Sequence, residues 1–431
     1  MTMKIFSKIK DNSFFHSILL ISGSTAIGQI LSIICMPIIT RLYTPEDFGV
    51  LSLFISILTP FSFIMSLKIE LAIPIAKNDS TAINIIKLCL LLITIISISL
   101  FLITIFFESD FLSIFNAQSF IGFSFFIPLS LIFMGCFNVF LQWLYRHRLF
   151  KQITLANILK SFSLNVCKIL FGYIGFTSLG LIYSFLISQI ISFLTLLKSF
   201  DVSKLSGRLD LVNSYKLLEI NKFFIFFSTP AQLLGSISAS IPILMLSKFF
   251  GDEITGLFGL SYSLINVPIS LIGTSVGRVF YSEVAFLSRT DPKRIKLLSN
   301  KLIKKLTLIS ILVSIIIFFG GPILFSHVFG DKWQLSGKFA KSLILAMASN
   351  MIFIPVSQVF TIFEKQHLSL FIDIVRIFLI LCVFFISSYL SLNPYLTIFI
   401  YSLNVFFIHF LTYIIANKII DSQIKNFILK F

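Results

Sequence analysis

Two lysines lie inside an apolar stretch that is long enough to cross a membrane. Lys160 and Lys168 belong to the run at about 153–172, and Asn157 and Ser161 lie on or near the same helical face. A lysine near the middle of a bilayer costs about 3 kcal/mol or more unless its ammonium reaches water or an opposite charge. Lys160 is therefore a candidate for a water-filled cavity. Lys168 either joins it there or extends to the outer headgroups.

Polar side chains form matching stripes on two of the predicted helices. They are Ser22, Thr25, Gln29 and Ser32 in the run 14–39, and Thr229, Gln232, Ser236 and Ser240 in the run 223–246. Such stripes avoid lipid, so they face either another helix or an aqueous cavity. Both alternatives remain open, and Gln29 and Gln232 are candidate substrate-binding residues.

Charged residues at the ends of apolar runs complete the set of candidates. The basic ones are Arg41, Lys68, Arg146, Lys248, Arg278 and Arg376, and the acidic ones are Glu70 and Asp373. Each alternatively serves only to anchor its helix in the membrane. Together, Lys68, Arg146, Arg278 and Arg376 would make an inward-opening cleft positive. Arginines would hold phosphate oxygens by paired hydrogen bonds.

Motifs for catalysis and for metal binding are missing from the sequence. It has no Walker phosphate loop, no HExxH and no GxSxG, and its five His and five Cys residues show no metal-ligand spacing. The sequence therefore predicts a protein that is not an enzyme and needs no metal or cofactor.

The elements that position these residues are predicted to be transmembrane helices. Of the 431 residues, 57% are hydrophobic and 53 are Phe, and the mean hydropathy is +1.00. Runs of the length needed to span a bilayer recur along the whole chain. The twelve predicted spans are at about 14–39, 48–67, 85–107, 119–141, 153–172, 178–197, 223–246, 257–280, 306–326, 340–362, 374–390 and 396–416.

The distribution of Lys and Arg predicts the orientation of these spans. With the N-terminus inside, most of the 34 basic residues fall in the inner segments, as the positive-inside rule requires. The net charge of +16 then reflects membrane topology and does not indicate nucleic-acid binding. Both termini are expected to be cytoplasmic.

A polar corner between the first two spans recurs in the second half of the chain. The segment "TRLYTPEDFGVLSL" at 40–53 aligns without a gap with "SKFFGDEITGLFGL" at 247–260. Arg41 matches Lys248 and Gly49 matches Gly256, and acidic residues there suit the start of a helix. Both corners are expected on the outer side, where they either help to close a gate or only fix the entry of the following helix.

The repeat predicts two pseudo-symmetric six-helix bundles around a central cavity. The boundaries are an N-terminal lobe at 1–197, a cytoplasmic amphipathic elbow at 198–222, a C-terminal lobe at 223–416 and a basic cytoplasmic tail at 417–431. Disordered linkers are the alternative for elbow and tail. Two parallel repeats around a cavity are typical of an alternating-access transporter. Glu70 and Asp373 are candidates for an acid that couples transport to H⁺ or Na⁺.

Three segments resemble the Wzx-type polysaccharide flippases, which belong to the multidrug/oligosaccharidyl-lipid/polysaccharide exporter superfamily. They are "IITRLYTPEDFGVLSLF", "SLKIELAIPIA" and "QWLYRHRLFK". The resemblance covers about 14–416 and implies a MATE-like fold around a cationic cavity. It also aligns Arg41, the Lys68–Glu70 pair and Arg146 with basic and acidic positions of the family, in which many members have Arg in place of Lys68.

The resemblance implies translocation of undecaprenyl-diphosphate-linked repeat units, such as those of O-antigen, from the inner to the outer leaflet of the bacterial plasma membrane. Membrane lipid is then a partner, as are a polymerase and chain-length proteins of the same pathway. Two alternatives stay open. One is a cation-coupled drug antiporter of the same superfamily, which would favour an acidic cavity, and the other is a membrane polysaccharide polymerase.

Overall fold

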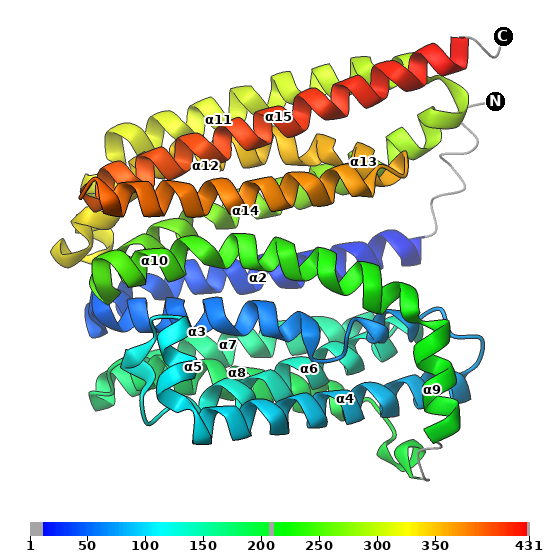
Figure 1. Ribbon diagram of the computed structural model, residues 1–431, viewed down its shortest axis with the longest axis horizontal. Helices are drawn as coiled ribbons and strands as arrows, with labels where there is room; N and C mark the ends of the chain where they lie inside the picture. Colours follow the sequence, from blue (N-terminus) through cyan, green and yellow to red (C-terminus); the bar gives the residue numbers. More distant parts are fainter. Residues whose placement is uncertain (1–11, 207–210, 429–431) are drawn as a thin grey trace. The chain divides into compact units, whose positions relative to one another are not determined.

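The computed structural model describes residues 12–206 and 211–428. The side chains of some residues within helices, Ser22 and Arg278 among them, lie outside this description. The described residues form helices and short connections and contain no strand (Figure 1). The predicted all-α fold is therefore confirmed.

The chain divides into two compact units. The first comprises Met1–Tyr43 and Ile57–Leu233, and the second comprises Thr44–Ser56 and Leu234–Phe431. The helix α3 (Pro45–Ile64) therefore contributes its first residues to the second unit and its last residues to the first.

Five long helices, two short ones and the end of α3 supply the first unit. Besides the end of α3, they are α2 (Asn12–Leu42), α4 (Asp79–Phe106), α5 (Glu108–Ile114), α6 (Phe126–Arg146), α7 (Phe150–Ile174), α8 (Ser178–Leu197) and α9 (Leu211–Ile220). Within this unit α7 packs between α2 and α8, and α6 packs between α8 and α4. The residues predicted to form an elbow contain α9 and the 3₁₀ turn Val202–Leu205.

The second unit is built on five long helices and one short one. They are α10 (Thr229–Thr290), α11 (Pro292–Phe329), α12 (Gln334–Phe353), α13 (Gln358–Ile362), α14 (Gln366–Tyr389) and α15 (Pro394–Ile428). Here α12 packs against both α11 and α15, and α14 packs against α15. A cluster of buried apolar residues that includes Phe280, Val356 and Phe360 joins α10 to α13 and α15.

Eleven described helices are long and apolar enough to cross a membrane. One of them runs from Phe224 to Gly273, which is 50 residues. A helix of that length extends roughly 75 Å, more than twice the hydrocarbon core of a bilayer. Its backbone leaves the helical conformation at Gly251 (φ 81°, ψ 178°), so we count it as two crossings. The prediction of about twelve spans is confirmed.

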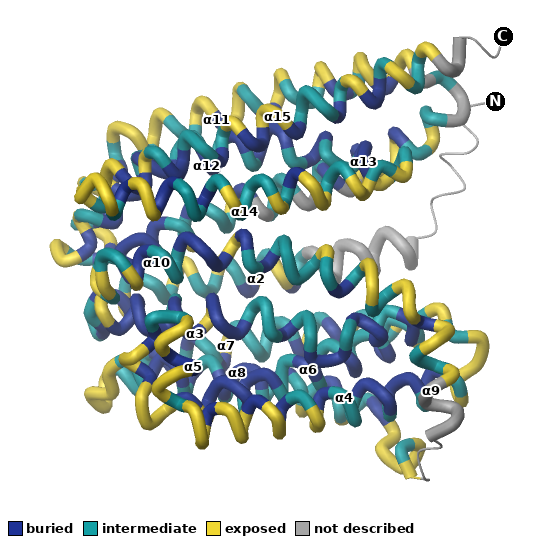
Figure 2. Tube along the Cα trace, viewed as in Figure 1, coloured by how far each residue is buried: buried dark blue, intermediate teal, exposed yellow. Residues whose placement is uncertain are grey.

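Large apolar side chains remain exposed on single faces of several helices, as the burial map shows for α4 and α11 (Figure 2). On α11, Leu308, Leu312 and Phe319 are 62–74% exposed. A continuous apolar face of this kind would be unfavourable in water. Its position on spanning helices indicates that it contacts lipid tails.

Several predicted segment ends differ from the structure. The fourth span, predicted at 119–141, is α6, which begins at Phe126, because residues 108–120 form α5 and a short turn. The span predicted at 340–362 ends at Ile362 as predicted, although its helix is interrupted after Phe353, where Pro355 has no N–H to continue the hydrogen-bond ladder. Residues 417–428, predicted as part of a tail, continue α15.

Candidate functional site

Polar residues of α2 and α7 join these two helices in the first unit. Asn165 donates from Nδ2 to Ser32 Oγ over 3.0 Å, and Asn157 donates to Ser24 Oγ over 3.4 Å. Gly28 lies directly against the Ser161 side chain, so a Cβ at this position would overlap it. The stripe on α2 therefore serves helix packing at Ser32.

The neighbouring Gln29 differs from Ser32, because its Oε1 is buried and has no hydrogen-bond partner among the described residues. A buried acceptor without a partner lowers stability. Gln29 therefore has unused hydrogen-bonding capacity among the described residues, and its role in substrate binding stays a prediction.

The two lysines of α7 are held inside the first unit. Lys160 places its Nζ 5.0 Å from the centroid of the Phe137 ring, a distance at which a cation is attracted to the ring face. Lys168 is only 9% exposed, so it does not extend from the surface of the unit. Its carbonyl accepts a 2.8 Å hydrogen bond from Tyr43 Oη.

Neither lysine takes part in the ion pairs described for this unit, which join Lys68 to Glu70 and Arg146 and His147 to Asp79. Burying an ammonium is costly unless an opposite charge accompanies it. Lys160 and Lys168 are thus two cations without a carboxylate partner among the described ion pairs.

Lys68 and Glu70 form a buried ion pair at the turn after α3. The Nζ of Lys68 lies 3.3 Å from Glu70 Oε1, and the two side chains are 10% and 2% exposed. Ser66 donates to Glu70 Oε2 over 2.6 Å, and the Phe63 ring centroid lies 4.5 Å from the ammonium. Lys68 adopts a left-handed backbone (φ 56°), a strained conformation for a residue with a side chain. The charges of Lys68 and Glu70 therefore balance each other within the protein.

Arg146 stabilises the segment that connects α3 to α4. Its guanidinium donates to the carbonyls of Ala76 (2.7 Å), Ile73 (3.2 Å) and Pro74 (3.4 Å), and Nε donates to Asp79 Oδ1 over 2.8 Å. These contacts occupy most of the donors of the side chain. In this structure Arg146 is a structural clamp.

Arg376 lies within the second unit, where it joins α14 to α10. Its Nη2 lies 2.7 Å from Asp373 Oδ1, and its Nε donates to Ser238 Oγ over 2.7 Å. Asp373, a predicted coupling acid, therefore already has a cationic partner. Lys160 and Arg376 each lie ten residues after the first residue of their helices, Phe150 and Gln366. In the first unit the cation lies on α7, which packs on α2. In the second unit it lies on α14, which is hydrogen-bonded to α10. Both cations lie at the same distance along the sequence from the start of their helices.

A polar cavity of about 240 Å³ surrounds Arg376, and we name it the Arg376 cavity. Four helices line it, and its residues are Gly235, Ser238, Ala239 and Tyr262 of α10, Ala346, Met347 and Asn350 of α12, Arg376 and Ile380 of α14, and Tyr401, Val405 and His409 of α15. His409 lies 2.9 Å through Nδ1 from Ser349 Oγ.

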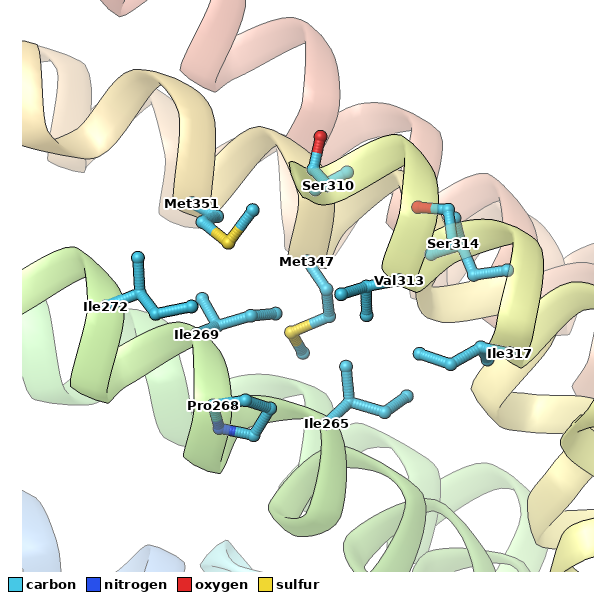
Figure 3. A pocket seen from close by; sticks show the side chains of 12 residues that line it. Ile265, Pro268, Ile269, Ile272, Ser310, Val313, Ser314, Ile317, Met347 and Met351 are labelled. Carbon is cyan, nitrogen blue, oxygen red and sulfur yellow. The ribbon is translucent and has the colours of Figure 1, made fainter. Parts of the chain in front are cut away.

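A second cavity in this unit is apolar. Its side chains converge from α10, α11 and α12, and they include Ile265, Pro268, Ile269, Val313 and Met351 (Figure 3). It lacks charged groups, so it has no chemistry for phosphate or sugar hydroxyls. Met347 lines both cavities.

The remaining candidates are placed as follows. Arg41 and Lys248 are exposed at the ends of the helices that precede the two corners, and Gln232 is half-buried in α10. The side chain of Arg278 lies outside the described residues.

Sequence reasoning missed Tyr262, Tyr401 and Asn350 as residues of the Arg376 cavity. A tyrosine in an apolar run has the pattern of a core residue. Only the eight-residue spacing of Tyr401 and His409, which places both on one helical face, was a usable signal.

The fold defines a class of multi-pass membrane protein. The structure resembles an inward-facing multidrug resistance MATE family transporter of the MOP superfamily, with a TM-score of 0.75 and 14% identity, covering 92% of this chain and 96% of that one. It resembles the lipid II flippase MurJ in an inward closed conformation equally well, with a TM-score of 0.75 and 14% identity, covering 95% and 91%. A MOP superfamily transporter from Pyrococcus furiosus is 16% identical with a TM-score of 0.63, covering 94% and 96%. The fold is that of the MOP superfamily.

Within this class, the sequence identifies a family. The chain belongs to the polysaccharide biosynthesis protein family, whose model matches residues 38–338. It is also 25% identical over 175 residues to an uncharacterised membrane protein in the cps region of Klebsiella pneumoniae. That match covers 40% of this chain and 36% of the relative, so the chain spans about a third of the length of this curated relative.

Proposed function

We propose that this protein is a flippase that moves undecaprenyl-diphosphate-linked oligosaccharide repeat units from the inner to the outer leaflet of the bacterial plasma membrane. Two observations together carry the proposal: the chain belongs to a polysaccharide biosynthesis family, and its fold is similar to that of MOP transporters. One structural relative, MurJ, is a flippase for a lipid-linked molecule. A protein that serves polysaccharide synthesis with such a fold is best placed at the step where the lipid-linked sugar crosses the bilayer.

The described cations support an anionic substrate. Lys160 and Lys168 are held within the first unit and have no carboxylate partner among its described ion pairs. A diphosphate would supply the missing negative charge. A drug antiporter for organic cations would instead require buried acids, and the buried Glu70 and the half-buried Asp373 are each paired with a base.

The transport mechanism follows from the shape of the substrate. Its head carries charges and hydroxyl groups that cannot cross hydrocarbon unaided. Its polyprenyl tail is apolar and dissolves in the lipid. The head therefore passes through the protein by alternating access while the tail stays in the membrane. Coupling to an H⁺ or Na⁺ gradient would supply the direction.

The proposal is tested by locating lipid-linked repeats in cells that lack this protein. Intact spheroplasts probed with a membrane-impermeant lectin or glycosidase report only the outer leaflet. We expect repeats to accumulate on the inner leaflet and to reach the outer one when the gene is restored. Repeats that reach the outer leaflet unpolymerised without this protein would show that it is a polymerase instead.

A further inference from the structure

We propose that the Arg376 cavity binds one sugar residue of the transported head group. The inference rests on the proposed function, which supplies a saccharide as substrate, and it assigns the recognition of that saccharide to the second unit. The evidence is the set of unpaired polar groups in the cavity, its balanced charge, and its size.

The cavity contains hydrogen-bonding groups that the protein itself does not satisfy. Tyr401 is 93% buried, being only 7% exposed, and no described hydrogen bond uses the hydroxyl of Tyr262 or Tyr401 or the side-chain amide of Asn350. Buried polar groups in native proteins nearly always have a partner. The partner here is therefore water or a polar ligand that enters the cavity.

His409 adds a hydrogen-bonding group to this set. The Ser349 hydroxyl lies 2.8 Å from the Ala346 carbonyl oxygen and 2.9 Å from His409 Nδ1, and it has one hydrogen to donate. When that hydrogen goes to the carbonyl, Nδ1 donates to Ser349 and Nε2 of the neutral ring is an acceptor; when it goes to Nδ1, Nε2 carries the N–H and is a donor. Either tautomer leaves Nε2 for a ligand.

The charge of the cavity favours hydroxyl groups over phosphate. Asp373 lies 2.7 Å from the Arg376 guanidinium and balances it, unlike the lysines of the first unit. Asp373 itself does not line the cavity, so a ligand there meets a guanidinium whose charge is already balanced. A sugar hydroxyl can accept a hydrogen bond from such a donor without carrying a charge of its own. The Tyr262 and Tyr401 rings provide apolar surface for the C–H faces of a sugar ring.

Small residues keep the cavity open. Its volume of about 240 Å³ is many times what one water molecule needs. Gly235 lines it, and a Cβ at this position would meet nothing within 4 Å. A larger side chain here would fill the cavity without removing any polar group or disturbing the packing.

The experiment uses the purified full chain in detergent and free monosaccharides as probes: glucose, galactose, N-acetylglucosamine and glucuronic acid. The readout is the unfolding temperature as each sugar is added. Gly235→Leu fills the cavity and Tyr401→Phe removes one hydroxyl. Gly273→Leu is the matched control, since Gly273 lies on the same helix in open space and outside the cavity.

We expect at least one sugar to raise the unfolding temperature of the wild type and of Gly273→Leu by about 2 °C or more. Gly235→Leu should show no rise, and Tyr401→Phe should need a higher sugar concentration. Stabilisation by inorganic phosphate alone, by none of the sugars, or to the same extent in Gly235→Leu would overturn the inference.

The leaflet assay on the same variants separates the two proposals. If the wild type moves the repeats and Gly235→Leu moves them equally well, the flippase function stands and the sugar site is wrong. If the wild type moves no repeats, the flippase function is wrong, and the binding experiment alone decides whether the cavity recognises sugar.

Discussion

At the scale of single residues, the Lys68–Glu70 pair is expected to matter for stability. Glu70→Gln would leave the ammonium of Lys68 buried without its counter-charge, and breaking a buried pair in this way costs about 3–5 kcal/mol. Unfolding in detergent by heat or denaturant measures the change. The double variant Lys68→Gln/Glu70→Gln should recover part of the loss, because no uncompensated charge remains. Wild-type stability in Glu70→Gln would contradict the pairing.

Lys160 and Lys168 are expected to matter for transport. Replacing either with Gln removes a cation that we assign to the substrate diphosphate; Lys168 is buried and Lys160 is half-buried. Losing one partner of a buried charge pair lowers affinity by at least about tenfold. The leaflet assay, normalised to protein in the membrane, measures the effect. The exposed Lys332, which is not among the candidate residues, supplies the control, since Lys332→Gln should leave transport unchanged. Normal transport by both α7 variants would remove the lysines from the site.

The candidate residues show which features a sequence reveals at this scale. Lys160 and Lys168 are evident because charge inside an apolar run is costly wherever the run folds. The structural role of Arg146 is not evident from the sequence, because the carbonyls that accept its hydrogen bonds lie some 70 residues earlier in the chain. The Arg376 cavity requires four helices to converge, and no local pattern encodes that.

At the scale of elements, the two repeated corners meet within the second unit. A Cβ on Gly49 would overlap the carbonyl of Asp252, and one on Gly256 would overlap the carbonyl of Pro45. The sequence repeat aligned these two glycines, and the structure shows that their corners approach one another closely. Their corners begin differently: Thr44 and Asp47 cap α3 reciprocally, whereas the second corner bends at Gly251.

We therefore expect Gly256→Ala to destabilise the protein by about 1–3 kcal/mol, the usual cost of overpacking. Gly49→Ala should cost a similar amount. The double variant should cost less than the two changes added, because both act on one contact. Unfolding of the purified variants measures this, with Gly273→Ala as the control in open space. Equal stability of Gly256→Ala and Gly273→Ala would show that the crossing tolerates a methyl group.

At the scale of the whole molecule, the sequence predicts how the chain crosses the membrane. Hydropathy sets the number of spans and the basic residues set their direction, so both can be read without tertiary contacts. The segment Thr44–Ser56 comes from the first half of the chain but belongs to the second unit. This could not be predicted from the sequence, because it depends on how α3 and α10 pack. With six crossings before the elbow and six after it, the termini and the elbow are expected on one side.

Reporter fusions test this arrangement. Green fluorescent protein, which folds in the cytoplasm, should fluoresce when joined to the C-terminus or after Ser206, and alkaline phosphatase, which needs export, should be active when joined after Thr44. The reason is that the basic residues concentrate in the segments that contain the first two sites. If the elbow and the C-terminus reported from opposite sides, the second half would cross the membrane an odd number of times. The two halves would then have opposite orientations at their ends, and a parallel repeat could not underlie transport.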